Sequence, residues 1–114
     1  MAFFHFVPVT AESGPGRPAA AEVGDYPKRG GFYTVRPAAE VDLGALEAQI
    51  AAEPRTRKLA EGVYASRSLI WGFPDITHVW SEDGNVHVSS HLVYGSSDLG
   101  VNRRRIEGWL AALN

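Results

Sequence analysis

One dipeptide, Asp83 followed by Gly84, constrains the fold of this chain more than any other feature of its sequence. It separates two runs in which apolar and polar residues largely alternate, 75–81 and 86–94. Asp-Gly between alternating runs is the strongest short-range signal for a β-hairpin with a two-residue turn. The sequence therefore predicts two antiparallel strands that pair in one register.

That register determines which side chains share a face of the hairpin. Its cross-strand pairs are Trp80 with His87, His78 with Ser89, and Ile76 with His91. One face, called the mixed face below, combines imidazoles with large apolar groups: Ile76, His78, Trp80, His87, Ser89, His91 and Val93. The opposite face is more aliphatic: Thr77, Val79, Val86, Val88, Ser90, Leu92 and Tyr94. We expect helices to pack on the aliphatic face.

Two more strands are predicted upstream. Residues 63–71 form one, and Gly72-Phe73-Pro74 ends it. If the loop 71–74 closes a second hairpin, Arg67 faces His78 and Trp71 joins the mixed face. The other is the run FYTVR at 32–36, which is rich in strand-favouring residues and is ended by proline.

Two helices are predicted from apolar side chains at helical spacing. The first follows Asp42, a suitable N-cap, and Pro54 stops it. Its apolar stripe comprises Leu43, Leu46 and Ile50. The second spans about residues 102–113, with Asn102 as N-cap and a stripe of Ile106, Trp109, Leu110 and Leu113. The charged stretch 55–61 between the first helix and the next strand is expected to be irregular or helical.

The N-terminal part is expected to be an arm. Residues 3–9 could form an edge strand, and residues 11–31, rich in Ala, Gly and Pro, are expected to be a loop or a mobile arm. We divide the chain into this arm, residues 1–31, and one domain, residues 32–114. The element order predicts an α+β fold: an antiparallel meander of three or more strands with two helices packed on one face.

Composition excludes several classes of function. With 114 residues and a net charge of −2, the chain is one domain with no general attraction to nucleic acid or acidic membranes. It has no cysteine, which excludes disulfides and cysteine-based zinc sites. No signal peptide, membrane span, phosphate loop or dinucleotide fingerprint is present, so we expect a cytoplasmic protein of bacterial type without a cofactor.

The sequence SSDLGVNRRRIE, residues 96–107, resembles the Domain of Unknown Function 1499 family. The matching residues are Asp98, Leu99, Gly100, Asn102, Arg103, Arg105 and Ile106. Phe73 and Asp75 match a second family motif, whereas Ile76 and His78 stand where that motif carries acidic residues. The resemblance covers roughly residues 42–113 and implies an α+β fold. It implies no activity, because none is established for the family.

The mixed face is the first candidate site. It would carry Arg67, Trp71, His78, Trp80, His87 and His91, a combination typical of a ligand groove or a partner interface. A metal is the alternative: His78 lies diagonal to both His87 and His91, and either pair could bind zinc, nickel or copper. All three could not do so, because His87 and His91 lie about 13 Å apart along one strand. The simplest alternative is three ordinary sheet histidines.

The start of the last helix is the second candidate site. Ser96, Ser97, Arg103 and Arg105 could hold a phosphate or carboxylate at the helix N-terminus. We favour a structural role instead: the carboxylate of Asp98 occupies that position or pairs with Arg103 or Arg105. Gly100 would then supply a permissive backbone, and Asn102 the cap.

Asp75 could be a general base, but turn formation or pairing with an arginine of the last helix is the favoured interpretation. Taken together, the residues favour a non-enzymatic binding module that uses the mixed face for an unidentified protein or small molecule. Three alternatives remain: a metal protein or enzyme centred on His78, anion binding at the last helix, and a structural subunit whose arm orders on a partner. The partner could also be a second copy of this chain in a homodimer.

Overall fold

The fold is an antiparallel sheet with two helices, in a computed structural model that describes residues 9–67 and 73–113. The elements are β1 (Gly24–Lys28), β2 (Gly31–Pro37), α1 (Leu43–Ala52), β3 (Thr56–Ala60), β4 (Val63–Arg67), β5 (Pro74–Glu82), β6 (Asn85–Leu92) and α2 (Val101–Ala111). The α+β class predicted from the sequence is confirmed. Within the described ranges, no helix is long and apolar enough to cross a membrane.

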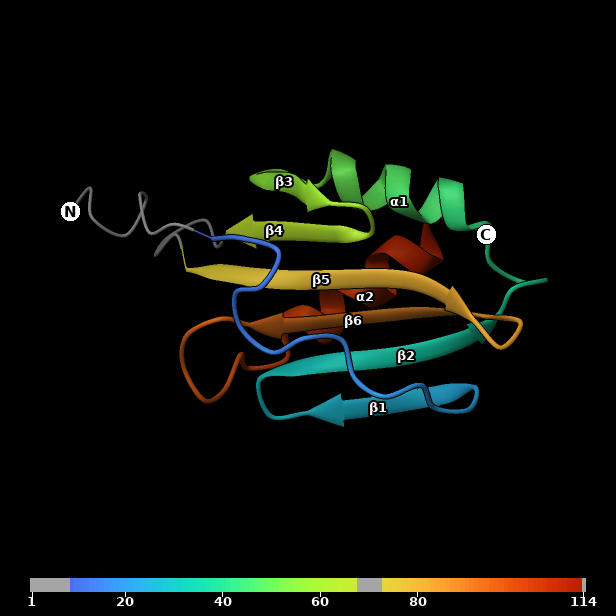
Figure 1. Ribbon diagram of the computed structural model, residues 1–114, viewed down its shortest axis with the longest axis horizontal. Helices are drawn as coiled ribbons and strands as arrows, with labels where there is room; N and C mark the ends of the chain where they lie inside the picture. Colours follow the sequence, from blue (N-terminus) through green and yellow to red (C-terminus); the bar gives the residue numbers. More distant parts are fainter. Residues whose placement is uncertain (1–8, 68–72, 114) are drawn as a thin grey trace.

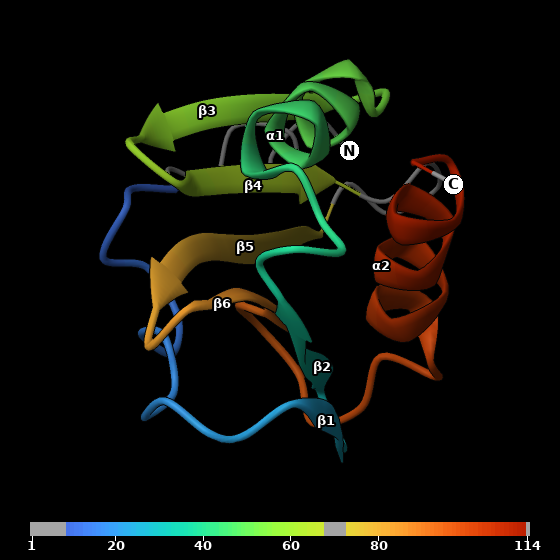
Figure 2. The ribbon, with the colours of Figure 1, turned by 90° about the vertical axis from the view of Figure 1, so that its right-hand side faces the viewer.

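The strand order β1-β2-β6-β5-β4-β3 explains how distant segments meet. After β2, helix α1 carries the chain to the far edge, and β3, β4, β5 and β6 then return as a meander that ends beside β2 (Figure 1). Both helices lie on one side of the sheet (Figure 2). The hairpin predicted over residues 75–94 therefore forms the centre of the sheet.

The register predicted from Asp83 and Gly84 is confirmed. The pairs Trp80–His87, His78–Ser89 and Ile76–His91 all lie opposite one another. Asp83 has a φ of 56° and Gly84 a φ of 76°, and a type I′ turn needs positive values at both positions. This is the physical reason why the dipeptide determines the register.

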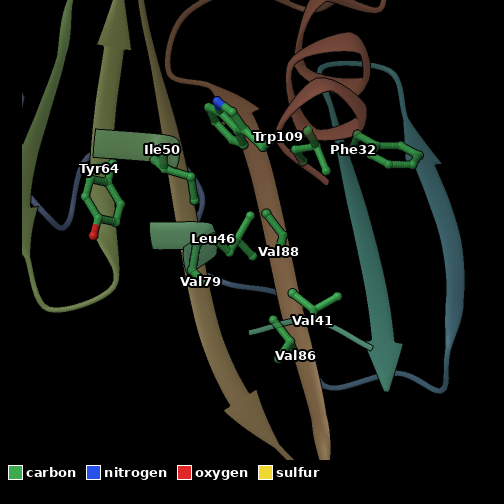
Figure 3. Packing of buried hydrophobic residues seen from close by; sticks show 10 residues of the cluster. Phe32, Val41, Leu46, Ile50, Tyr64, Val79, Val86, Val88 and Trp109 are labelled. Carbon is green, nitrogen blue, oxygen red and sulfur yellow. The ribbon is translucent and has the colours of Figure 1, made fainter. Parts of the chain in front are cut away.

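The aliphatic face carries the larger core, as predicted. Val79, Val86 and Val88 pack against α1 and α2 in a cluster whose other buried members are Phe32, Val41, Leu46, Ile50, Tyr64, Ile106 and Trp109 (Figure 3). Asp42 caps α1 as expected, since its carboxylate accepts a hydrogen bond from the Ala45 amide at 3.0 Å. Glu53 is the C-cap, so α1 ends just before Pro54.

Two segments expected to lack strands contain one each. Residues 55–61 include β3, because the TRKLA run completes the sheet by pairing with β4. Pairing partners that are distant in sequence decide strand formation more strongly than local charge does. Residues 24–28 of the expected loop 11–31 form the edge strand β1, paired with β2. Pro27 is tolerated because β1 pairs on one side only.

The second hairpin differs from the prediction. Strand β4 ends at Arg67, and Arg67 lies opposite Pro74, whereas Val63 lies opposite His78. The expected Arg67–His78 pair is therefore wrong, because the register places the β4–β5 connection between Arg67 and Pro74 and not between residues 71 and 74. Trp71 lies outside the described residues, and so does all but the last residue of the edge strand expected at 3–9.

Residues 9–23, called the strap below, cross the face of the sheet opposite the helices. Figure 1 shows this segment, in blue, passing over the strands on its way to β1. Figure 2 shows it on the side of the sheet away from α2. The strap has no helix or strand of its own. The sheet thus has a layer on each side, and the layer over the mixed face is a single segment without helix or strand.

Candidate functional site

The mixed face contains a stack of rings. Trp80 and His87 lie with centroids 4.9 Å apart and an interplanar angle of 14°. Tyr33 of the neighbouring strand lies 5.9 Å from Trp80 and 6.0 Å from His87, and Tyr26 of β1 extends the stack at 5.4 Å from Tyr33. The stack therefore crosses four strands, β1, β2, β6 and β5, and runs diagonally, because Tyr33 lies opposite Ser89 and not opposite His87.

His87 is the polar centre of this stack, and it is fully buried, with 0% of its surface exposed. Its Nδ1 lies 2.7 Å from the Tyr33 hydroxyl and its Nε2 lies 3.1 Å from the Glu82 carbonyl oxygen. Both ring nitrogens are thus occupied. A metal bound by His87 and His78 would have to displace one of the two hydrogen bonds that hold the His87 ring in place.

The strap covers this stack, so the mixed face is not the open surface that the strands alone suggested. The guanidinium of Arg17 lies 4.9 Å from the centre of the Trp80 ring. The Ala21 amide donates a hydrogen bond to the Tyr33 hydroxyl at 3.0 Å. Val9 is buried with Ala65 and Ile76 in a small separate cluster. These contacts leave Trp80 only 7% exposed.

The other two histidines of the mixed face differ from His87. The Nε2 atom of His78 is buried and has no hydrogen-bond partner. Burial lowers the pKa of His78, the nearby Arg17 lowers it further, and a hydrogen bond with the backbone of Pro15 works in the opposite direction. His91 is half-buried, and its Nδ1 lies 2.7 Å from the Leu92 carbonyl oxygen. Among the described residues, no cluster of three or more metal-ligating side chains occurs.

A separate groove lies where β5 begins, β6 ends and α2 starts. Its volume is about 200 Å³, and it is lined by Phe73, Asp75, Leu92, Tyr94, Ser97, Asp98, Leu99 and Val101. Five large hydrophobic side chains are exposed in the described part of the chain, and four of them, Phe73, Tyr94, Leu99 and Val101, line this groove. Exposed apolar side chains that gather around one cavity indicate a binding site more strongly than the same residues scattered singly.

Asp98 holds the wall of the groove in place. Its Oδ1 accepts a hydrogen bond from the Gly100 amide at 2.9 Å, and its Oδ2 accepts from the Asn102 amide at 2.9 Å and the Asn102 side chain at 2.8 Å. The expectation that the Asp98 carboxylate occupies the anion position at this helix start agrees with these contacts. Two amides of the first helical turn thereby have Asp98 as acceptor, since the Val101 amide donates to its carbonyl oxygen at 3.1 Å.

Asn102 is not the cap predicted for this helix. The residue before the first turn is Gly100, in a left-handed conformation with a φ of 79°, and Asn102 is buried inside the turn. Its side chain instead joins two charged groups, because it donates to Asp98 and accepts from Arg105 at 3.2 Å. The Asp98 carboxylate supplies the hydrogen bond expected of a cap, because helix α2 begins at Val101 and the residue predicted as its cap lies in the first turn.

Asp75, at the edge of the groove, pairs with Arg105 at 3.0 Å, which agrees with the favoured interpretation of Asp75. The two side chains are only 11% and 12% exposed. Burial raises the pKa of Asp75, while the hydrogen bond and charge of Arg105 oppose that shift. Because Arg105 is committed here and Arg103 pairs with Glu107 at 3.1 Å, the arginines proposed for an anion site each already have a carboxylate partner.

Leu99 is the most unusual residue of the groove. It has a φ of 55°, a left-handed conformation that L-residues other than glycine, asparagine and aspartate rarely adopt. The residue is 82% exposed, the largest value among the exposed large hydrophobic residues of the described part of the chain. Such a conformation costs roughly 1–2 kcal/mol. A strained backbone that holds a large apolar side chain in solvent is typical of ligand-binding positions.

The groove was not identified from the sequence as a site. The sequence motifs include Phe73, Asp75, Asp98 and Leu99, whereas strand alternation predicts Tyr94 on the helix-covered face. A usable signal was present: apolar residues stand on both sides of the polar stretch 95–98, where strand and helix periodicity both fail. Apolar residues that flank such a stretch belong to neither a strand face nor a helix face directed at the core, so their side chains remain exposed.

Comparison with known proteins gives one result. A family model described as "Protein of unknown function (DUF1499)" matches residues 21–113. The resemblance stated for residues 42–113 is confirmed, and the match extends it through β1 and β2. No curated protein and no solved structure matches the chain.

Proposed function

We propose that this chain, which belongs to the DUF1499 family of proteins of unknown function, is a binding module for a segment of another protein. The groove at the start of α2 would accept an apolar side chain of that segment. The observation that carries the proposal is the gathering of Phe73, Tyr94, Leu99 and Val101 around one cavity. Burying such groups on association contributes about 25 cal/mol per Å² of apolar surface.

The size of the groove favours a protein partner over a cofactor or metabolite. Pockets for small molecules usually have volumes of about 300–1,000 Å³, whereas this groove measures about 200 Å³. It has room for one anchoring side chain of a larger partner. Interfaces of this kind draw much of their affinity from a few apolar or aromatic anchors that enter small pockets.

The wall of the groove is preorganised. Asp98 fixes the turn through three hydrogen bonds, and Asn102 connects that turn to the buried Asp75–Arg105 pair. A binding surface that is already rigid loses little conformational entropy when a partner arrives. The titratable side chains that line the groove are Asp75, Tyr94 and Asp98, and the two carboxylates are held by donors. This supports recognition rather than catalysis.

The mixed face is a second candidate binding surface, supported by one observation. The Nε2 atom of His78 is buried without a partner beneath a thin strap, and an unsatisfied buried nitrogen is costly. A partner that displaced the strap would gain access to His78, Trp80 and His87, with His91 and Arg67 at the same sheet face. This binding mode requires a rearrangement, whereas the groove is already open.

A peptide display library tests the proposal. Random peptides selected on the wild-type protein are expected to share an apolar anchor, and Leu99→Gly should raise their Kd about tenfold or more, because a buried Leu contributes about 1.5–3 kcal/mol. Glycine relieves the left-handed strain at this position, so the variant keeps its fold. Val23→Ser, at an exposed apolar residue outside the groove, is the matched control. Equal binding by wild type and Leu99→Gly would contradict the proposal.

A further inference from the structure

Helix α2 carries three consecutive arginines near its start, at positions 103–105, and no acidic residue in its first turn. A cation at a helix N-terminus interacts unfavourably with the macrodipole, so we expect another contact to stabilise each arginine there. Arg105 pairs with Asp75, and Arg103 pairs with Glu107 while lying 4.9 Å from the centre of the Phe32 ring. Arg104 differs, since none of the carboxylates in the described residues forms an ion pair with it.

Arg104 does not line the groove itself but contacts the backbone of Leu99, which does. Its Nη1 donates a hydrogen bond to the Leu99 carbonyl oxygen at 3.3 Å, so the guanidinium sits beside the strained residue that forms the groove wall. The nearest carboxylate in sequence, Asp98, is already bound by three N–H donors of the turn. Arg104 is exposed, and its remaining donors can reach a partner. A positive charge with open donors therefore lies next to Leu99, one of the apolar residues of the groove.

We infer that the partner segment carries an aspartate or glutamate next to its apolar anchor, and that this carboxylate pairs with Arg104. The inference rests on the function proposed for the groove and specifies the chemistry of its ligand. An arginine side chain matches a carboxylate in charge and in its fork of donors. The apolar anchor supplies most of the affinity, and the acidic residue selects among segments that carry a suitable anchor.

The expected effect is small because the pair would be exposed. Exposed ion pairs typically contribute 0.2–1 kcal/mol, which corresponds to a Kd change of about 1.5- to fivefold. Salt should weaken this contribution, since charges at a surface are screened over about 8–10 Å at ordinary ionic strength. The apolar contribution of Leu99 should persist at high salt.

A double-mutant cycle tests the inference. A selected peptide and its variant with Glu→Gln or Asp→Asn beside the anchor are titrated calorimetrically against wild type and Arg104→Gln at low salt. A coupling of about 1.5- to fivefold in Kd that disappears at high salt is expected. Arg103→Gln is the matched control and should show no coupling, because its guanidinium is engaged by Glu107.

The outcomes separate the inference from the proposed function. Peptides that depend on Leu99 but show no coupling to Arg104 would overturn the inference and leave the proposed function standing. Peptides that bind wild type and Leu99→Gly equally would overturn both. A dimer of the wild-type protein that Leu99→Gly converts to a monomer would assign the groove to a second copy of the chain and overturn the acidic-peptide ligand.

Discussion

The two faces of the sheet are covered by layers of different construction. Helices α1 and α2 cover one face with side chains, and the cluster beneath them joins both helices to β2, β4, β5 and β6. The strap covers the other face with an extended segment that contributes one buried side chain, Val9. Its remaining contacts are chiefly a cation–π contact from Arg17 and hydrogen bonds of its backbone.

Because of this difference, the two layers should open at different free energies. A segment that buries few apolar groups can leave its site at a small fraction of the free energy of global unfolding, whereas a face sealed by two helices opens only when the domain unfolds. The helix-covered face therefore maintains the fold. The mixed face has polar rings buried beneath a strap whose displacement requires little free energy. It therefore remains a candidate site.

The largest effect is expected on the helix-covered face. Ile50 is fully buried between α1 and the sheet, so Ile50→Ala leaves a cavity and should lower the free energy of unfolding by about 2–5 kcal/mol. Chemical denaturation followed by circular dichroism measures the change. A loss below about 1 kcal/mol would mean that the cluster can collapse around the cavity and that the two layers differ less than their packing indicates.

A smaller effect is expected at the one buried side chain of the strap. Val9→Ala removes two methyl groups from a small cluster and should destabilise the closed strap by about 1–2 kcal/mol. Hydrogen exchange should show faster exchange for residues 9–23, whereas the amides of β5 and β6 keep their protection. Val23→Ala, at an exposed position near the end of the same segment, is the control. Loss of protection throughout the sheet would mean that strap and sheet open together.

The sequence alone predicts those parts of the fold that depend on neighbouring residues, such as turns, helix caps and the alternation of side chains along a strand. The hairpin register followed from Asp83 and Gly84, whose backbone angles admit one kind of turn. Capping by Asp42 and the helix-covered aliphatic face followed from spacing. Strands β1 and β3 were missed because each is created by a partner strand rather than by its own composition.

The candidate site was harder to predict for a related reason. The ion pair of Asp75 with Arg105 joins residues thirty positions apart, and it was anticipated only because both belong to recognisable motifs. The groove depends on the left-handed backbone of Leu99, and a leucine in the sequence gives no signal for that conformation. The strap over His87 depends on a path through space that an Ala-, Gly- and Pro-rich sequence does not encode by periodicity.

The smallest effect, and the one most specific to the strap, concerns pH. His78 faces Ser89 of β6 and Val63 of β4, and the strap adds Arg17 as the charged group nearby. Burial holds the pKa of His78 below 6.5, so the closed conformation of the strap favours the neutral form of the imidazole. When the strap opens, the ring regains its ordinary pKa and takes up a proton more readily. The closed form is therefore fully favoured above about pH 6.5 and loses stability as the pH falls below that value.

Hydrogen exchange of residues 9–23 at pH 7.5 and pH 5.5, corrected for intrinsic rates, measures this effect. We expect less protection at the lower pH in the wild-type protein and little change in His78→Gln, which cannot titrate. His91→Gln is the matched control, since that ring lies on the same face with Nδ1 already bonded to a carbonyl oxygen. The helix-covered face should show no such pH dependence. A pH response that survives in His78→Gln would assign the sensitivity to another group and remove the link between burial of His78 and closure of the strap.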